Sequence, residues 1–303
     1  ARRLARQQPV DTGLPVICVG NLTAGGTGKT PVVRALLARL TEQGLAAHGL
    51  SRGYGGHEAG PLRVDPGRHT AADVGDEPLM LAIDYPIWVA RDRVAGARAA
   101  AASGAEVLVM DDGHQNPSLR KALSLVVVDG ETRDNEWPLG DGSVFPAGPL
   151  REPLAAGLAR ADAVVLLLPS DLDTPDPDLM KVFSDRPVLL ARLEPVAPPP
   201  GGPQVGFAGI GKPWKVERAL RAAGCNLVDF APFPDHAAYS QGQLKALQSL
   251  ASHHGAGLIT TEKDWSRLTP EWRERVTPWP VQAIFSDPDA LGQLLRAAIT
   301  RRD

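Results

Sequence analysis

The stretch "VGNLTAGGTGKTPVV", residues 19–33, decides the fold. An apolar segment at 14–20 reads as a strand, and a glycine-rich turn follows it. After Lys29 the apolar residues recur on one helical face and Gly44 is a plausible stop: Val32, Val33, Leu36, Leu37 and Leu40. A strand, a glycine-rich turn and a helix are typical of a phosphate-binding loop, where backbone N–H groups and a helix N-terminus converge on phosphate. We therefore predict a nucleotide phosphate site here.

This loop departs from the strict P-loop pattern at one position, because Thr23 stands where the first glycine is usual. In such loops the lysine, here Lys29, serves the β- and γ-phosphates, and the hydroxyl after it, here Thr30, serves Mg²⁺. The alternative is a glycine-rich turn with an incidental lysine. The predicted ATP-binding residues are Thr23, Ala24, Gly25, Gly26, Thr27, Gly28, Lys29 and Thr30.

Two carboxylates follow a second apolar strand, in the segment "VLVMDDG" at residues 107–113. Asp111 and Asp112 would stand at the carboxyl end of that strand, where open α/β sheets bind their ligands. P-loop enzymes hold Mg²⁺ partly through such a carboxylate. We predict Thr30, Asp111 and Asp112 as the metal site, leaving open which aspartate is nearer Mg²⁺ and whether one only caps the following turn.

The bulk composition is that of an ordinary globular protein, with 303 residues, 43% hydrophobic residues and a net charge of −3. The chain has no overall excess of positive charge that would indicate binding to nucleic acid. The cysteines, Cys18 and Cys225, are far apart, and we expect Cys18 to be a buried free thiol. No apolar run reaches the length of a membrane span. Because the chain begins without methionine, an N-terminal segment with an anchor is compatible with it; the basic residues 1–6 would either attract anionic lipid or form a solvated tail.

Buried-strand segments alternate with helical segments along the chain, which predicts a doubly wound, mostly parallel α/β sheet of the P-loop NTPase type. A cluster of prolines between 195 and 203 interrupts the alternation. We predict a P-loop domain at 1–186, a proline-rich connection at 187–204, and a smaller α/β domain at 205–303 that closes the active-site cleft.

Nine short segments together resemble the tetraacyldisaccharide 4'-kinase family, the lipid A 4'-kinases of Gram-negative bacteria. They run in family order over most of the chain: "VGNLTAGGTGKTP", "LSRGYGG", "VGDEPLMLA", "VARDR", "DDGHQ", "PAGPLREP", "FAGIGKP", "FPDHAAYS" and "TTEKDW". The altered first glycine is itself a feature of that family. The usual "DDGFQH" is "DDGHQN" here, so His114 and Asn116 depart from the pattern.

The resemblance implies transfer of the γ-phosphoryl group of ATP to the 4'-hydroxyl of a lipid-linked glucosamine disaccharide. It implies work at the cytoplasmic face of the inner membrane, peripherally or through an N-terminal anchor, and no obligate protein partner. It points to Asp92 in "VARDR" as the base and to His236 in "FPDHAAYS" as its partner, with Lys29 as the third catalytic residue. Composition alone favours a surface aspartate at a helix start and a solvated loop histidine.

Three further residues are weaker candidates for contacts to substrate or transition state: Arg52, Gln115 and Arg151. Arg151 suits phosphate because its guanidinium pairs two acceptors, although a structural ion pair for Arg151 or Glu152 is an equal alternative. Lys263 and Asp264 are expected to end a strand, where they would read adenine or brace a domain interface.

Two other classes fit the loop and the strand-end aspartates. A regulatory ATPase or GTPase would act on a protein partner, but we find no switch motif and no guanine-selecting "NKxD". A soluble small-molecule kinase or ligase of the same group is the second alternative. Dependence on an acylated lipid discriminates among the three.

Overall fold

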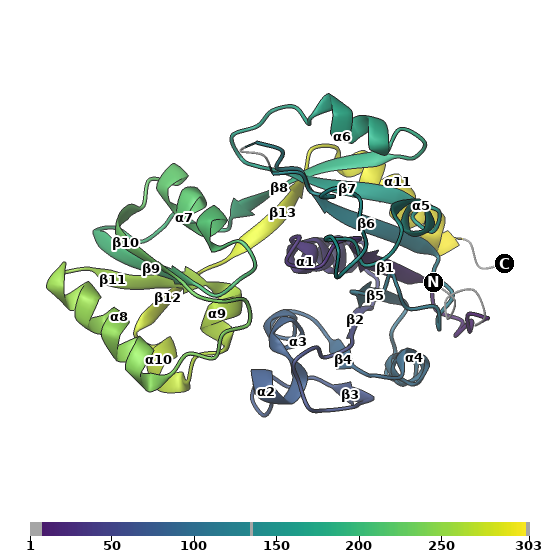
Figure 1. The fold of residues 1–303 in the computed structure, drawn as a ribbon. Coiled ribbons are helices and arrows are strands. Elements are labelled where there is room, and N and C mark those ends of the chain that lie inside the picture. The colour runs from purple at the N-terminus through teal and green to yellow at the C-terminus, as the bar shows by residue number, and fades with distance from the viewer. Residues whose placement is uncertain (1–7, 134–135, 301–303) are drawn as a thin grey trace. The chain divides into compact units, whose positions relative to one another are not determined.

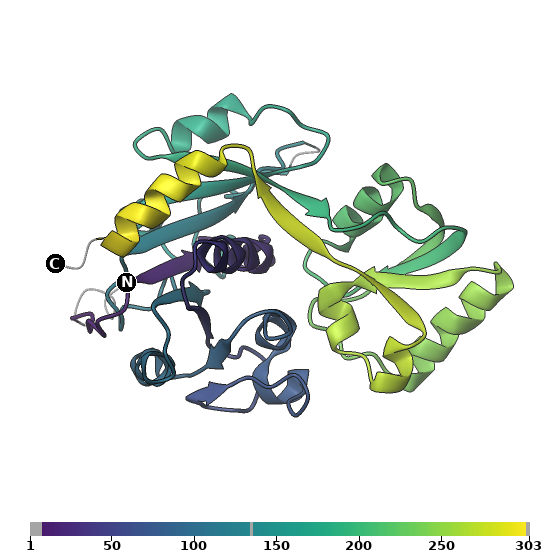
Figure 2. The ribbon, with the colours of Figure 1, turned by 180° about the vertical axis from the view of Figure 1, so that it is seen from behind.

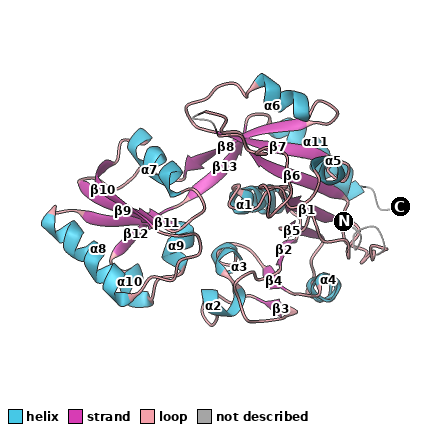
Figure 3. Cartoon of the chain, in the orientation of Figure 1, coloured by secondary structure: helices cyan, strands magenta, loops and turns pink. Residues whose placement is uncertain are grey.

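The computed structural model describes residues 8–133 and 136–300, and the basic segment 1–6 lies outside them. The chain divides into two compact units, which we name unit 1 (Ala1–Glu194 and Gln282–Asp303) and unit 2 (Pro195–Val281). Strands alternate with helices along both units (Figures 1 and 3).

Unit 1 is built on a nine-stranded sheet with the order β13-β8-β7-β6-β1-β5-β2-β4-β3. Its strands are β1 (Val16–Gly20), β2 (Ala47–Ser51), β3 (Leu62–Arg63), β4 (Ile87–Val89), β5 (Val107–Asp111), β6 (Leu123–Asp129), β7 (Ala163–Leu168), β8 (Val188–Pro195) and β13 (Val281–Phe285). Neighbouring strands from β8 to β4 are parallel, and β3 is antiparallel to β4. The predicted mostly parallel α/β sheet is confirmed.

Helices cover both faces of this sheet. They are α1 (Lys29–Glu42), α2 (Ala71–Val74), α3 (Asp76–Leu81), α4 (Arg93–Ala102), α5 (Leu154–Leu158), α6 (Pro177–Val182) and α11 (Pro288–Thr300). Side chains of α1, α3 and α11 share one core cluster with the sheet, whereas α4, α5 and α6 pack in two clusters on the opposite face. Seen from behind, α11 lies along the sheet (Figure 2). The fold is therefore doubly wound.

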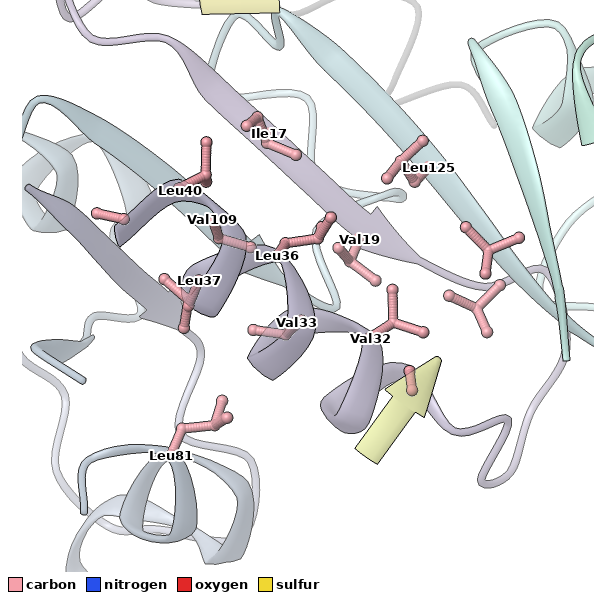
Figure 4. Close-up of a cluster of buried hydrophobic side chains, with 14 of the residues drawn as sticks. Ile17, Val19, Val32, Val33, Leu36, Leu37, Leu40, Leu81, Val109 and Leu125 are labelled. Atoms are coloured by element: carbon pink, nitrogen blue, oxygen red, sulfur yellow. The ribbon is translucent and has the colours of Figure 1, made fainter. Parts of the chain in front are cut away.

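Helix α1 holds the phosphate-loop candidate against the middle of the sheet. The five apolar residues predicted to share one helical face, among them Val33, Leu36 and Leu40, are the buried residues of α1. Figure 4 shows them clustered with Ile17 and Val19 of β1. Each such side chain contributes about 1.5–3 kcal/mol by leaving water, so this packing fixes the start of α1 at the end of β1.

Unit 2 is a smaller α/β unit with a parallel four-stranded sheet in the order β10-β9-β11-β12. Its elements are β9 (Pro203–Ala208), α7 (Pro213–Ala222), β10 (Asn226–Pro232), α8 (Gln241–His253), β11 (Gly257–Thr261), α9 (Glu262–Ser266), α10 (Pro270–Arg273) and β12 (Val276–Trp279). Leu244 and Leu247 of α8 pack on one face of the sheet, and Leu220 of α7 packs on the other.

The unit boundaries differ from the predicted ones at two places. Residues 188–194 belong to β8 of the large sheet rather than to a connection, because no proline interrupts them between Pro187 and Pro195. Residues 282–303 return to unit 1, where β13 is next to β8 and Leu291 and Leu295 of α11 enter the core. Unit 2 is thus an insertion in unit 1.

None of the helices in the described part of the chain combines the length and apolar character needed to cross a membrane.

Candidate functional site

The candidate site begins where the carboxyl ends of β1 and β5 lie side by side, with Val19 opposite Asp111. From β1 the chain runs through α1 to β2 on one side, whereas from β6, the neighbour of β1 on the other side, it runs to β7, away from β1. Connections that diverge in this way leave a ligand crevice outside the strand ends. The glycine-rich loop and both aspartates therefore stand at the position where such sheets bind ligands.

The loop between β1 and α1 is fixed by the segment around Leu150. Ala24 N–H donates to the Pro149 carbonyl at 2.8 Å, and Thr23 forms a bridge with Leu150. The Thr23 carbonyl accepts from Asn21 Nδ2 at 2.8 Å and from Arg151 Nε at 3.1 Å. Only Gly25 and Gly28 in this loop have a positive φ. Thr23 can therefore replace the usual glycine because its backbone needs no left-handed conformation.

Asp112 lies in a cluster of opposite charges above the loop. Its carboxylate is 3.5 Å from Lys29 Nζ, and it accepts from Arg151 Nη1 at 2.8 and 3.0 Å. Partial burial opposes its ionisation, but Lys29 and Arg151 outweigh burial and hold the pKa of Asp112 below its usual range. Its φ of 50° is a left-handed conformation that costs a non-glycine residue about 1–2 kcal/mol. This strain at a charged turn is typical of functional sites.

Asp111 has the opposite electrostatic setting, although it is the adjacent residue. Its side chain is buried, and its Oδ1 has no hydrogen-bond partner among the described residues. Burial, together with the charge of Asp112, raises the pKa of Asp111 to about 7 against the attraction of Lys29. A buried carboxylate with an unsatisfied oxygen suits a hard cation.

The two aspartates rest on a buried polar layer. His114 is fully buried, with Nε2 at 2.9 Å from the Gly157 carbonyl and Nδ1 at 3.1 Å from Ser124 Oγ, and burial lowers its pKa to about 4. Lys121 Nζ donates to the carbonyls of Gly113 and His114 at 2.7 and 3.0 Å. The departure from the family pattern at His114 is therefore a neutral, hydrogen-bonded part of the scaffold.

Gln115 continues this layer toward the loop. Its Nε2 donates to the Asn21 carbonyl at 2.9 Å and to Glu152 Oε1 at 3.1 Å, and Glu152 also pairs with Arg160. The Oε1 atom of Gln115 is buried and has no hydrogen-bond partner among the residues described. Glu152 is thus a structural ion-pair partner, whereas Arg151 reaches the charged cluster.

Asp92 stands at the start of α4, as composition alone favoured. Its Oδ1 caps the helix by accepting from the N–H groups of Val94 and Ala95 at 2.9 and 3.1 Å. The residue is exposed, and the next residue, Arg93, is buried. Burial, with the repulsion of Arg52, lowers the pKa of Arg93 to about 10, and Asp111 and Asp112 act in the opposite direction. The side chain of Arg93 itself donates to the Ala90 carbonyl.

His236 lies in unit 2, in the loop between β10 and α8, with a φ of 57°. Its Nδ1 is 3.4 Å from Arg267 Nη2, and its Nε2 is 3.3 Å from Lys263 Nζ. Lys263 and Asp264 do not end a strand as expected, because β11 stops at Thr261 and both residues belong to α9. Asp264 is fully buried and helps to organise this region.

The residues present fit a bound nucleotide and a divalent cation. Gly26 has an ordinary φ, and a Cβ added to it would meet no atom within 4 Å. The described residues therefore do not require a glycine at this position. Backbone that must approach a phosphate closely does require one. One side-chain oxygen each of Thr27 and Asp111 is buried and has no hydrogen-bond partner in the described structure, so both oxygens are available to bind a ligand. No group of three or more His, Cys, Asp or Glu side chains in the described ranges forms a metal site by itself.

Sequence reasoning missed Asn21 and Lys121 as parts of this site. Asn21 could have been found, because an asparagine directly after a strand commonly bonds the backbone of the next turn. Lys121 gave no signal, because its partners are backbone carbonyls.

The chain matches the family model described as Tetraacyldisaccharide-1-P 4'-kinase over residues 1–300. A relative in Caulobacter vibrioides named tetraacyldisaccharide 4'-kinase is 70% identical over 295 residues, 97% of this chain and 88% of the relative. One of the same name in Maricaulis maris is 56% identical over 298 residues, 98% of this chain and 86% of the relative. The crystal structure of LpxK from Aquifex aeolicus in complex with ATP is similar with a TM-score of 0.74 and 26% identity, over 96% of this chain and 90% of that one. The chain belongs to the tetraacyldisaccharide 4'-kinase family.

Proposed function

We propose that this protein is an ATP-dependent lipid kinase. It transfers the γ-phosphoryl group of ATP to the 4'-hydroxyl of a tetraacylated glucosamine disaccharide 1-phosphate, a step of lipid A biosynthesis. The observation that carries the proposal is the cluster of Lys29, Asp112 and Arg151 above the glycine-rich loop, with contacts of 2.8–3.5 Å. Family membership gives the acceptor, since the relatives bear the name of that reaction.

The loop residues bind and orient the triphosphate. Backbone N–H groups of residues 25–28 would face the phosphates, since the Ala24 N–H already donates to the Pro149 carbonyl, and Lys29 and Arg151 supply positive charge where negative charge develops on the transferred group. Bound together with ATP, Mg²⁺ would neutralise phosphate oxygens as a Lewis acid. Thr30, Asp111 and Asp112 would hold it, with Asp111 as the nearer aspartate, and Asp112 also keeps Lys29 and Arg151 in position.

Asp92 accepts the proton of the 4'-hydroxyl in this proposal. The new bond joins the 4'-oxygen to the γ-phosphorus, the bond to the β-phosphate oxygen breaks, and ADP leaves. Capping of α4 engages Oδ1 of Asp92, so Oδ2 is the oxygen that receives the proton. His236 acts with Asp92, and Gln115 and Arg52 contribute to binding of substrate or transition state. Unit 2 takes part in the reaction through His236.

The acylated substrate requires the enzyme to work at a membrane. We propose association with the cytoplasmic face of the inner membrane, where ATP is available.

The test is transfer of ³²P from γ-labelled ATP to a detergent-dispersed tetraacyl disaccharide 1-phosphate. We expect label in the lipid, dependent on Mg²⁺, and little ATP hydrolysis without lipid. ATP hydrolysis that depends on a protein partner, with no label in lipid, would favour the alternative of a regulatory ATPase. Labelling of a water-soluble acceptor instead would favour a soluble small-molecule kinase.

A further inference from the structure

We infer that Arg267 is a positioning residue that holds His236 in one tautomer, with Nδ1 unprotonated and Nε2 carrying the proton. The inference rests on the proposed function only for the part that His236 plays in the reaction. Arg267 follows α9, and His236 lies in a separate loop of unit 2. Their contact is Arg267 Nη2 to His236 Nδ1, at 3.4 Å.

Arg267 is held in place by a buried carboxylate. Its Nη1 donates to Asp264 Oδ1 at 2.9 Å and to the Gly209 carbonyl at 3.0 Å. Asp264 Oδ1 also accepts from the Tyr239 hydroxyl at 2.7 Å and from Gly209 N–H at 3.1 Å. The side chain of Asp264 is 0% exposed and that of Arg267 is 7% exposed. The guanidinium therefore has little freedom to turn away from the imidazole.

The backbone of the His236 loop is fixed to the same group. His236 N–H donates to the Gly209 carbonyl at 3.2 Å, the oxygen that also accepts from Arg267. A Cβ added to Gly209 would lie 2.9 Å from the Tyr239 hydroxyl and 3.1 Å from Asp264 Oδ1. The Tyr239 hydroxyl and the Asp264 carboxylate thus leave no space for a methyl group at Gly209, whose carbonyl bonds both the His236 backbone and the Arg267 guanidinium.

The chemistry of the contacts then selects the tautomer. Arginine offers only N–H donors, so its contact with Nδ1 requires that nitrogen to accept. Lys263 Nζ is also a donor and lies 3.3 Å from Nε2, but a neutral imidazole has one acceptor nitrogen. Arg267 is fixed by two further bonds, whereas the side chain of Lys263 is 21% exposed and its ammonium group also lies 3.8 Å from the carboxylate oxygen Asp235 Oδ1, toward which it can turn. Nδ1 is therefore the acceptor, and Nε2–H is a donor suited to a carboxylate or phosphate oxygen.

The experiment is a long-range ¹H–¹⁵N correlation spectrum of the full chain with ¹⁵N-labelled histidine, which separates protonated from unprotonated ring nitrogens. His236 signals are assigned by their loss in His236→Gln. We expect an unprotonated Nδ1 in the native chain, loss of this pattern in Arg267→Gln, and its retention in Lys263→Met. A protonated Nδ1 in the native chain, or a change in Lys263→Met with none in Arg267→Gln, would overturn the inference.

Kinetics test the consequence for the reaction. Arg267→Gln should lower kcat by up to about 100-fold, the order of loss that a misplaced group causes. Its loss should not exceed that of His236→Ala, and the double variant should be no slower than His236→Ala. The matched control is Arg221→Gln, because Arg221 also bonds one carboxylate, Glu217, and one backbone carbonyl, that of Leu227, and its kcat should stay native.

Multiplicative losses would overturn the positioning role. Absence of lipid phosphorylation by the native chain would instead count against the proposed function, while the ring-nitrogen signals still test the contact.

Discussion

Replacing Asp111 by asparagine should stabilise unit 1 while it weakens the kinase. Burial raises the pKa of Asp111 from its ordinary value of 3.8 to about 7, so the folded state resists ionisation of this group. The difference corresponds to about 4 kcal/mol at a pH above both values. Asparagine has the same shape and no charge, but its amide needs new partners. We therefore expect a gain of about 1–4 kcal/mol at pH 8.

The sign of the pH dependence follows from the raised pKa. Between the unfolded value near 3.8 and the folded value of about 7, the folded state binds the extra proton, so Asp111 lowers stability as the pH rises through this window. The advantage of Asp111→Asn over the native chain should be largest at pH 8 and nearly absent below pH 4. Hydrogen exchange of peptides covering β1 and β5, in metal-free buffer, measures the difference in unit 1 alone.

Asp112→Asn is the control, because its effect should have the opposite sign. Lys29 and Arg151 keep the pKa of Asp112 below its usual range, so removal of this carboxylate should give no gain at pH 8. Equal exchange rates in Asp111→Asn and the native chain at pH 8 would refute the assignment of Asp111 as a buried, destabilised carboxylate. Turnover of the Asp111→Asn variant should fall, and excess Mg²⁺ should partly restore it, since a carboxamide is a poorer ligand for a hard cation.

Lys29→Ala should lose about 10²–10³-fold in turnover with an unchanged circular dichroism spectrum, because its charge serves the phosphates; near-native turnover at saturating ATP would refute that role. His114→Phe should cost about 1–3 kcal/mol, because it removes the buried hydrogen bonds of the imidazole to the Gly157 carbonyl and to Ser124 Oγ. His114 opposes the contribution of Asp111, because the fold holds the pKa of His114 at about 4: the stability advantage of the native chain over His114→Phe in denaturant titrations should shrink as pH falls from about 6.5 toward 4. Asp92→Ala should lower kcat by about 10²–10⁴-fold with little change in ATP affinity, and His236→Ala should cost less. Their double variant should match Asp92→Ala, and multiplicative losses would assign the two residues to separate steps.

The sequence predicted the part of the fold that depends on local pattern. The helical period of Val33, Leu36 and Leu40 placed α1, because a buried helix face repeats every three to four residues. The return of residues 282–303 to unit 1 was not predicted, because the pairing of β13 with the large sheet joins segments far apart in sequence. Nothing in the local sequence of α11 distinguishes a helix of unit 2 from one of unit 1.

The site divides in the same way. Asp111 and Asp112 could be placed at a strand end from the apolar run before them, but their opposite pKa shifts could not be predicted. Those shifts depend on burial and on Arg151, which lies 39 residues away from Asp112 in sequence. The contact between Arg267 and His236 could not be predicted from the sequence either, since it joins two separate loops of unit 2.

The most direct test of the account is the position of the phosphate in the product. The native chain, incubated with ATP, Mg²⁺ and a detergent-dispersed tetraacyl disaccharide 1-phosphate, should yield a lipid with one added phosphate, which ³¹P NMR and mass spectrometry assign to the 4'-oxygen. Lys29→Ala should yield almost none. A phosphate added at another position, or ATP turnover with the lipid unchanged, would contradict the account.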